Sequence, residues 1–346
     1  MLKQTPTTRA HVNGKRSCPR LGFLGAGWIG RHRLQAIQRS GAATVAAIAD
    51  PSAEARQRAA EFTPDARHLP SLDALLDHDV DGIVISTPSA LHAEQSIQAL
   101  QAGRAVFCQK PLARTAAETK QVLDAARMAD RLLAVDLSYR HIKGIAQMRE
   151  LIRQGDVGHI YAAHLTFHNA YGPDKEWYYD PALGGGGCVI DLGIHLVDLA
   201  LWLLDFPRVE TLHSRLFAGG RPLAALAETV EDYAVVQLDL ASDTAMQMVC
   251  SWNAPAGMDA VIEVVLHGTK GGLRLANRKG SFYSFSAEHL QGTTSSLLAQ
   301  TFEDWSWGGK AAVRWAQRLG EDASFDPAAN HLQQVADVLD RIYGRS

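Results

Sequence analysis

The amino-acid sequence predicts an α/β protein with two unlike domains. We expect an N-terminal doubly wound parallel sheet and a C-terminal α+β domain with a large, mostly antiparallel, open-faced sheet. The chain has 346 residues, more than one hydrophobic core usually serves. Up to residue 137, short apolar runs alternate with helical periods, as in parallel sheets covered on both faces. Beyond residue 160, longer strands alternate polar and apolar residues, which indicates one exposed face.

The first domain is expected at residues 21–140, after a flexible N-terminal tail of residues 1–20. The tail is polar and shows no apolar segment of a signal peptide. Within the domain, strands are expected at 21–24, 44–49, 82–86, 105–108 and 132–136. Helices are expected between them at 29–39, 53–62, 91–102 and 116–129. This alternation predicts the doubly wound sheet.

The second domain is expected at residues 141–326, with a separate C-terminal helix in 327–346. A transitional helix near 142–153 precedes the strands of this domain. These strands are expected at 160–168, 233–240, 246–252 and 261–267. Because antiparallel sheets are often covered on one side only, the open face is a candidate interface of a homodimer or homotetramer.

Residues 291–326 match no regular period and are rich in Ser, Thr, Gly and tryptophan. One interpretation is a lid or arm. The other is an irregular surface segment whose tryptophans, Trp305, Trp307 and Trp315, pin it to the core.

The composition excludes several classes of protein. There are 34 Lys+Arg and 37 Asp+Glu, and no element concentrates the basic residues, which argues against nucleic-acid binding. The most apolar stretch, 192–204, is interrupted by His195 and Asp198, so we expect no membrane span and a cytoplasmic protein. The four cysteines form no CxxC pair, which argues against a zinc site and a disulfide framework.

A glycine-rich turn, GAGWIG at residues 25–30, follows the first strand and opens a helix. Its first glycine permits a tight turn, its second lets a pyrophosphate approach the backbone, and its third allows close helix–strand packing. The helix N-terminus attracts the negative charge. The context predicts a dinucleotide site rather than a fortuitous turn. Its expected residues are Gly25, Gly27, Trp28, Ile29 and Gly30.

Asp50 ends the next strand, twenty residues after Gly30. Its carboxylate can accept hydrogen bonds from both ribose hydroxyls, whereas it would repel a 2′-phosphate. The sequence therefore favours NAD over NADP. Arg56 is a possible partner for that phosphate, so NADP stays open.

Ser86, Thr87 and Pro88 end a further strand at the carboxyl edge of the sheet, where ligands bind in open α/β folds. Thr87 and Pro88 are therefore expected to line the nicotinamide side. A plain strand-ending turn would favour the same residue types.

Two features are candidates for the chemistry. Asp191 and His195 are four residues apart on an apolar helix, so both side chains are expected on one face, with Asp198 one turn further. A neutral imidazole suits the removal of a hydroxyl proton, which makes His195 a candidate base. Lys110 follows a strand and could stabilise the developing alkoxide. A metal site and a satisfied core histidine are the competing readings of this spacing.

Several of these motifs, in this order, resemble the Gfo/Idh/MocA oxidoreductases over nearly the whole chain. They are the GAGWIG turn, the STPSALH segment, the QKP tripeptide, the GGGGCVIDLGIHLVDLALWLL helix and the late HGTKGGL strand. The resemblance implies NAD(P)-dependent dehydrogenases or reductases of sugars, inositols and related polyols. It also implies a Rossmann domain, a second domain that builds dimers or tetramers through its sheet, and no metal.

The resemblance carries functional roles to individual residues. The catalytic lysine falls on Lys110, the paired aspartate and histidine on Asp191 and His195, and the nicotinamide-side pair on Thr87 and Pro88. Around them, the expected cofactor contacts include Ser86, His92, Gln109 and Lys110.

Two positions depart from the family pattern. Gln109 stands where glutamate is common, which removes a negative charge beside Lys110 and would tend to lower the pKa of that lysine. We interpret the change as tuning of the site. Ser89 stands where asparagine is frequent.

Candidate substrate contacts precede the active-site helix. They are Tyr139, Arg140, His168, Trp177 and Tyr178, beside Lys110, Asp191 and His195 themselves. Aromatic faces suit sugar rings, and an arginine can bind a hydroxyl, carboxylate or phosphate.

The sequence thus predicts an NAD(H)-dependent oxidoreductase that moves hydride between a secondary alcohol of a sugar, inositol or related polyol and the nicotinamide. The expected partners are small molecules and copies of the same chain. The alternatives are a non-catalytic NAD-binding sensor and a reductase or glycoside-processing oxidoreductase of the same family.

Overall fold

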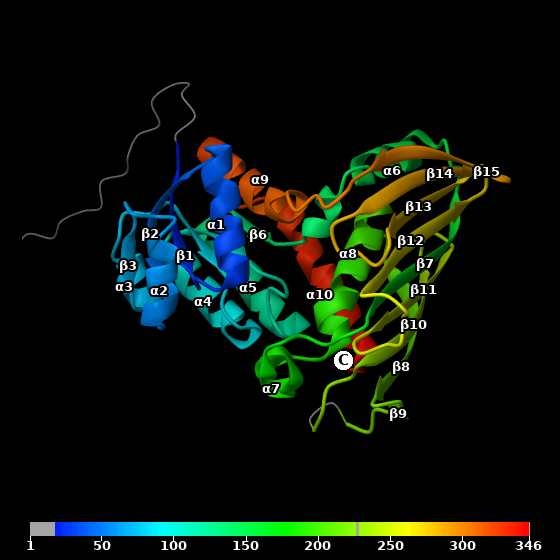
Figure 1. Ribbon diagram of the computed structural model, residues 1–346, viewed down its shortest axis with the longest axis horizontal. Coiled ribbons are helices and arrows are strands. Elements are labelled where there is room, and N and C mark those ends of the chain that lie inside the picture. Colours follow the sequence, from blue (N-terminus) through cyan, green and yellow to red (C-terminus); the bar gives the residue numbers. More distant parts are fainter. Residues whose placement is uncertain (1–17, 226–227, 346) are drawn as a thin grey trace, which may run out of the picture.

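The protein has two lobes, each built on one sheet (Figure 1). The computed structural model describes residues 18–225 and 228–345. Of the tail expected at 1–20, residues 1–17 lie outside the described residues.

The first lobe contains a six-stranded parallel sheet in the order β3-β2-β1-β4-β5-β6, which confirms the doubly wound fold. Its strands are β1 Arg20–Leu24, β2 Thr44–Ala49, β3 Arg67–Leu69, β4 Gly82–Ile85, β5 Ala105–Cys108 and β6 Leu133–Val135. Its helices are α1 Trp28–Ser40, α2 Ala53–Ala60, α3 Leu72–Leu76, α4 Ser89–Gln101 and α5 Ala116–Ala129. The strand order reverses between β1 and β4, where such folds form their ligand crevice.

Alternate residues of the first sheet enter two different cores. Ile83 and Ile85 of β4 belong to a core that continues into the second lobe, whereas Val84 packs on the opposite face. Such strands are apolar throughout, which is why β4 and β5 are buried along their whole length. The elements β3 and α3 were not predicted, because the short, half-exposed strand has no apolar period.

The second lobe contains a nine-stranded sheet in the order β15-β14-β13-β12-β7-β11-β10-β8-β9. Among the described strand pairs of this second sheet, only β7 and β11 run parallel. The strands are β7 Ile160–Asn169, β8 Val209–Ala218, β9 Arg221–Pro222, β10 Tyr233–Leu240, β11 Thr244–Ser251, β12 Ala260–Gly268, β13 Gly272–Asn277, β14 Phe285–Gln291 and β15 Thr294–Gln300. Along β10, buried residues alternate with residues that are more exposed, so one face of the sheet is open as expected.

Helices cover the other face of this sheet. They are α6 Ile145–Gln154, α8 Ile194–Leu203 and α10 His331–Ile342, with the short α7 Pro181–Gly184 near the first lobe (Figure 1). Single turns lie at η1 Ser138–His141, η2 Glu176–Tyr179, η3 Val189–Gly193 and η4 Pro327–Asn330. The stretch Pro181–Leu203 has the length and composition of a membrane span, but 89% of its most apolar window is buried inside the protein. It is a core element of the second lobe.

The expectation that residues 291–326 are irregular was wrong, whereas Trp307 and Trp315 are buried and hold the segment to the core as expected. It contains β15 and the helix α9 Trp307–Glu321. This helix returns to the first lobe, where Trp315 packs on Phe107 with ring centroids 5.7 Å apart. Gly309 permits the approach, since a Cβ there would lie 2.4 Å from the Cβ of Ala36 on α1. The glycines at the start of α9 obscured its period, although Ala311, Ala312, Trp315, Ala316 and Leu319 carry it.

Candidate active site

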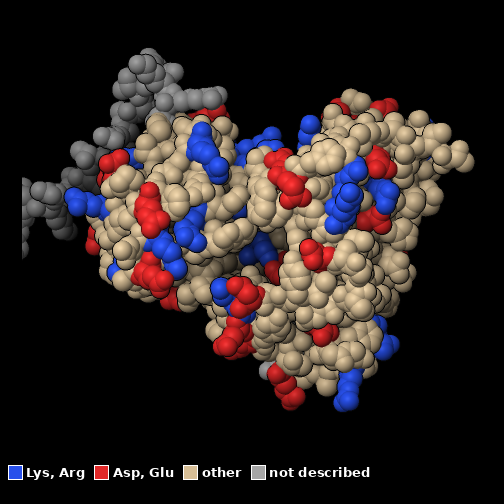
Figure 2. All heavy atoms as spheres, viewed as in Figure 1, with Lys and Arg blue, Asp and Glu red and all other residues tan. Residues whose placement is uncertain are grey.

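A cavity of about 190 Å³ lies between the lobes, beside the carboxyl ends of β1, β5 and β6. Side chains of both lobes line it, including Lys110 from the first and His195 from the second. The space-filling view shows the molecule hollowed between its lobes, with charged side chains at the bottom of the hollow (Figure 2).

The glycine turn has the backbone that its sequence predicts. Gly25 has a φ of +94°, and a Cβ there would lie 2.6 Å from the carbonyl oxygen of Ser86. A Cβ on Gly30 would lie 2.3 Å from the carbonyl oxygen of Gly25. Gly27 caps α1 without a side-chain hydrogen bond and faces open space. The free N–H groups at this helix start fit the pyrophosphate of a dinucleotide.

Asp50 is held in place by the backbone at the end of β2. Its Oδ2 accepts a hydrogen bond of 2.8 Å from the N–H of Ala26, and its Oδ1 accepts one of 2.8 Å from Ser52. Arg56 Nη1 donates to the carbonyl oxygens of Asp50, at 2.5 Å, and of Pro51, at 3.1 Å. The carboxylate thus lies beside the glycine turn, and the guanidinium of Arg56 is bound to the backbone of the same residue.

The expected nicotinamide side is built on one hydrogen-bonded loop. Thr87 Oγ1 donates to Gln95 Oε1 at 2.6 Å. His92 is buried, with Nδ1 2.6 Å from the carbonyl oxygen of Pro111 and Nε2 2.7 Å from that of Thr87. Burial lowers the pKa of His92. The ring of His92 therefore links the Thr87 loop to the loop that follows Lys110.

Lys110 and Asp191 meet across the two lobes. Lys110 Nζ donates to Asp191 Oδ1 at 2.6 Å and to the carbonyl oxygen of Asp191 at 2.9 Å. Trp252 Nε1 donates to Asp191 Oδ2 at 3.1 Å, so both carboxylate oxygens are engaged. Both members of the ion pair keep less than a fifth of their side-chain surface exposed. This pair fixes the lysine at the wall of the cavity.

His195 lies on the same cavity and packs on Tyr139, with ring centroids 4.5 Å apart. Its Nδ1 is buried and has no hydrogen-bond partner among the described residues. Burial, followed by the positive charges of Lys110 and Arg33, holds the pKa of His195 well below its ordinary value. The imidazole is therefore neutral at neutral pH and able to accept a proton.

The backbone between Asp191 and His195 is not the ordinary helix that their spacing implied. Residues Val189–Gly193 form a π-helical turn that runs directly into α8. Such turns occur often at functional sites, since they redirect side chains. Asp198 points to Arg140 instead, accepting a hydrogen bond of 2.8 Å from Arg140 Nε as part of a two-contact ion pair. In the described part of the chain, no three metal-ligating side chains converge.

Gln109 belongs to a buried polar network below Lys110. Its Nε2 donates to Asp136 Oδ2 at 2.6 Å. Arg33 Nε donates to the same oxygen at 2.5 Å and carries the charge that compensates Asp136. A glutamate at position 109 would place a second carboxylate against Asp136. The amide is thus matched to a neighbour that the sequence did not reveal.

The other expected substrate residues lie at different distances from the cavity. Tyr139 lines it. Tyr178 packs on Trp252 and is stacked on Trp177 at 3.8 Å, so this pair lies behind the Asp191 contact. His168 binds Ser251 Oγ at 2.7 Å and Arg140 binds Asp198; neither lines the cavity.

Sequence reasoning missed much of the cavity wall. Phe282 and Tyr283 come from the turn before β14, Trp305 from the loop before α9, and Trp307 from the first position of α9. Trp305 stacks on Tyr283 with ring centroids 3.4 Å apart. A cluster of tryptophans in a polar segment was the available signal, but only the folded chain brings it to His195.

The sequences of both lobes match models of one protein family. Residues 20–137 match the oxidoreductase family with an NAD-binding Rossmann fold of the GFO/IDH/MocA group. Residues 145–274 match the GFO/IDH/MocA C-terminal domain.

Individual proteins show the same likeness. Inositol 2-dehydrogenase of Acidothermus cellulolyticus is 30% identical over 274 residues, which cover 78% of this chain and 76% of that protein. 1,5-Anhydro-D-fructose reductase of Ensifer adhaerens is 31% identical over 196 residues, covering 56% of this chain and 59% of that protein, less than two thirds of its length. The structure of levoglucosan dehydrogenase in complex with NADH and L-sorbose superposes with a TM-score of 0.80 at 21% identity, covering 94% of this chain and 96% of that one. This last likeness concerns the fold.

Proposed function

Since the chain belongs to the GFO/IDH/MocA family of oxidoreductases, we propose that it transfers hydride between a secondary alcohol of a sugar, inositol or related polyol and NAD. The names of two relatives given above, inositol 2-dehydrogenase and 1,5-anhydro-D-fructose reductase, denote enzymes that act on such molecules. The observation that carries the proposal is the contact of Lys110 with Asp191 beside the neutral His195.

Each of these residues has its own role in the proposed reaction. NAD would accept the hydride when bound along the glycine turn. His195 takes the hydroxyl proton, because its imidazole is neutral and lines the cavity. Lys110 donates to the substrate oxygen and stabilises the negative charge that grows there, while Asp191 positions the ammonium. The aromatic side chains that line the cavity supply flat apolar faces for a sugar ring; they include Phe282, Tyr283, Trp305 and Trp307.

The charge at Asp50 supports NAD as the cofactor, because a 2′-phosphate would meet a carboxylate already fixed by two backbone N–H groups. Arg56 is the residue through which NADP would bind instead.

The open face of the nine-stranded sheet supports a homodimer or homotetramer as the assembly. Val235, Val249 and Val265 are half-buried on that face and would be covered by a second copy. Light scattering should show an oligomer that a Val249→Glu substitution dissociates; a wild-type monomer would contradict the assembly.

We propose a cytoplasmic location; the most apolar stretch, Pro181–Leu203, is largely buried inside the protein.

The first experiment is to follow nicotinamide reduction with purified protein against sugars, inositols, sugar acids and glycosides, each with NAD and NADP. Turnover with NAD and one class of substrate supports the dehydrogenase. No turnover in either direction, with tight NADH binding, would contradict it and favour a non-catalytic sensor.

A further inference from the structure

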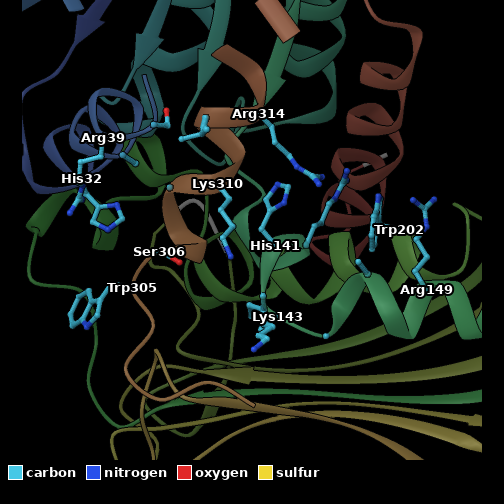
Figure 3. Close-up of a pocket in the computed structure, with 18 of the residues that line it drawn as sticks. His32, Arg39, His141, Lys143, Arg149, Trp202, Trp305, Ser306, Lys310 and Arg314 are labelled. Atoms are coloured by element: carbon cyan, nitrogen blue, oxygen red, sulfur yellow. The ribbon is translucent and has the colours of Figure 1, made fainter. Parts of the chain in front are cut away.

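A second and larger cleft, of about 1020 Å³, lies between the lobes beside the active-site cavity. Helices α1 and α9 of the first lobe form one wall, and η1 and α6 form the other (Figure 3). His32 and Trp305 line both the cleft and the cavity, so the two adjoin. Neither Lys110 nor His195 lines the cleft.

The lining of this cleft is strongly basic. Its cationic residues are Arg39, Arg140, Lys143, Arg149, Arg153, Lys310 and Arg314. Glu150 is the single acidic residue among those that line it. A concave surface with one sign of charge concentrates counter-ions of the opposite sign.

Acidic side chains behind the wall compensate only part of this charge. Asp198 pairs with Arg140, and Asp205 lies 3.0 Å from Arg149 and 3.7 Å from Arg153. The guanidinium carbon of Arg149 lies over the ring of Trp202, 4.0 Å from its centroid. Its Nε is buried and has no hydrogen-bond partner among the described residues.

Four further cations have no ion-pair partner within residues 18–225 and 228–345: Arg39, Lys143, Lys310 and Arg314. Lys310 and Arg314 extend from α9 toward His141 (Figure 3). Burial, and after it the positive charge of Arg314, lowers the pKa of His141 to about 4. Asp304 interacts electrostatically with Lys310 and Lys143, and Glu150 lines the cleft, but the cations outnumber these carboxylates, so the cleft keeps a net positive charge.

We propose that this cleft binds a small molecule that carries two or more phosphate groups. Cations that reach in from different helices can all be engaged only by a multivalent anion, and guanidinium groups match phosphate oxygens in pairs. The volume exceeds that of a single phosphate and suits a ligand of nucleotide size. Trp305, at the border with the active-site cavity, offers a face for an attached ring.

Calorimetric titration with inorganic pyrophosphate tests this site, on protein saturated with NADH so that the glycine turn is occupied. Wild-type protein should bind pyrophosphate, more weakly as salt is added. The triple variant Lys143→Gln, Lys310→Gln, Arg314→Gln should bind it at least about tenfold more weakly, since several charged hydrogen bonds are lost. The matched control neutralises three exposed lysines elsewhere: Lys120→Gln, Lys175→Gln and Lys270→Gln. It should bind like the wild type.

Three results would overturn the proposal. One is the absence of pyrophosphate binding to the NADH-loaded wild type; another is equal loss in the triple variant and its control. The third is loss of binding in Lys110→Met, which would place the anion in the active-site cavity. None of these measurements depends on turnover, so the proposed dehydrogenase activity stands or falls separately.

Discussion

Gln109 donates a hydrogen bond of 2.6 Å to Asp136 Oδ2, the carboxylate oxygen that also accepts from Arg33. Asp136 is buried, and its other oxygen has no partner among the described residues. A neutral amide at position 109 therefore avoids a second buried carboxylate beside Asp136.

A Gln109→Glu substitution should destabilise the protein by about 1–3 kcal/mol at pH 8, because it brings two carboxylates together in the core. The pair would keep a proton in the folded state, so its pKa would be raised above the unfolded value. The loss is then absent at low pH and grows as pH rises. Thermal unfolding from about pH 5 to about pH 8 measures it. Gln101→Glu, on the exposed end of α4, is the control; a deficit independent of pH would contradict the assignment.

Replacing Lys110 by Met should reduce the turnover number about 10²–10³-fold, since the donor to the developing alkoxide is lost. NADH affinity should change little, because the glycine turn and Asp50 remain. Steady-state kinetics and NADH titration separate the two effects. Lys120→Met, at an exposed site on α5, should behave like the wild type. Unchanged turnover in Lys110→Met would remove its proposed role.

The pH dependence of alcohol oxidation should report His195. Burial, with the charges of Lys110 and Arg33, lowers its pKa below the ordinary 6.5. A base is active when deprotonated, so the rate should stay high down through pH 6.5 and fall only below it. His195→Asn should lose about 10²-fold or more in turnover, whereas His213→Asn on the exposed side of β8 should not. An acidic limb centred above 6.5 would contradict this.

Asp50→Asn should shift the cofactor preference toward NADP by about tenfold or more in kcat/KM, because it removes the charge that faces a 2′-phosphate and leaves Arg56 beside it. Kinetics with both cofactors measure the ratio. The exposed Asp65→Asn serves as a comparison. An unaltered ratio would show that another residue selects the nucleotide.

Gly309→Ala should destabilise the protein by about 1–3 kcal/mol, because the added methyl group meets the Cβ of Ala36 at 2.4 Å where α9 crosses α1. Gly308→Ala is the matched control, since its Cβ would first meet Arg33 Nη1 at 3.4 Å. That variant should be neutral or more stable by up to about 1 kcal/mol. Equal thermal unfolding of both variants would contradict the packing argument.

The sequence alone determined the doubly wound sheet, the glycine turn and the one-sided second sheet, and it singled out Lys110, Asp191 and His195 as candidate site residues. These features are local: a hydrophobic period, a turn that only glycine can form, or a motif within a few residues. The open face of β10 and the positive φ of Gly25 followed from such patterns.

Only the tertiary structure decided which side chains meet. Asp136 joins Gln109 and Arg33, Trp252 joins Asp191, and the start of α9 joins the wall beside His195. It also turned Arg140 away from the cavity toward Asp198, where it lines the basic cleft. The physical reason is that each of these contacts joins residues far apart in the chain. Their distances are set by how two sheets and α9 pack, a sum of many weak contacts that no short stretch of sequence encodes.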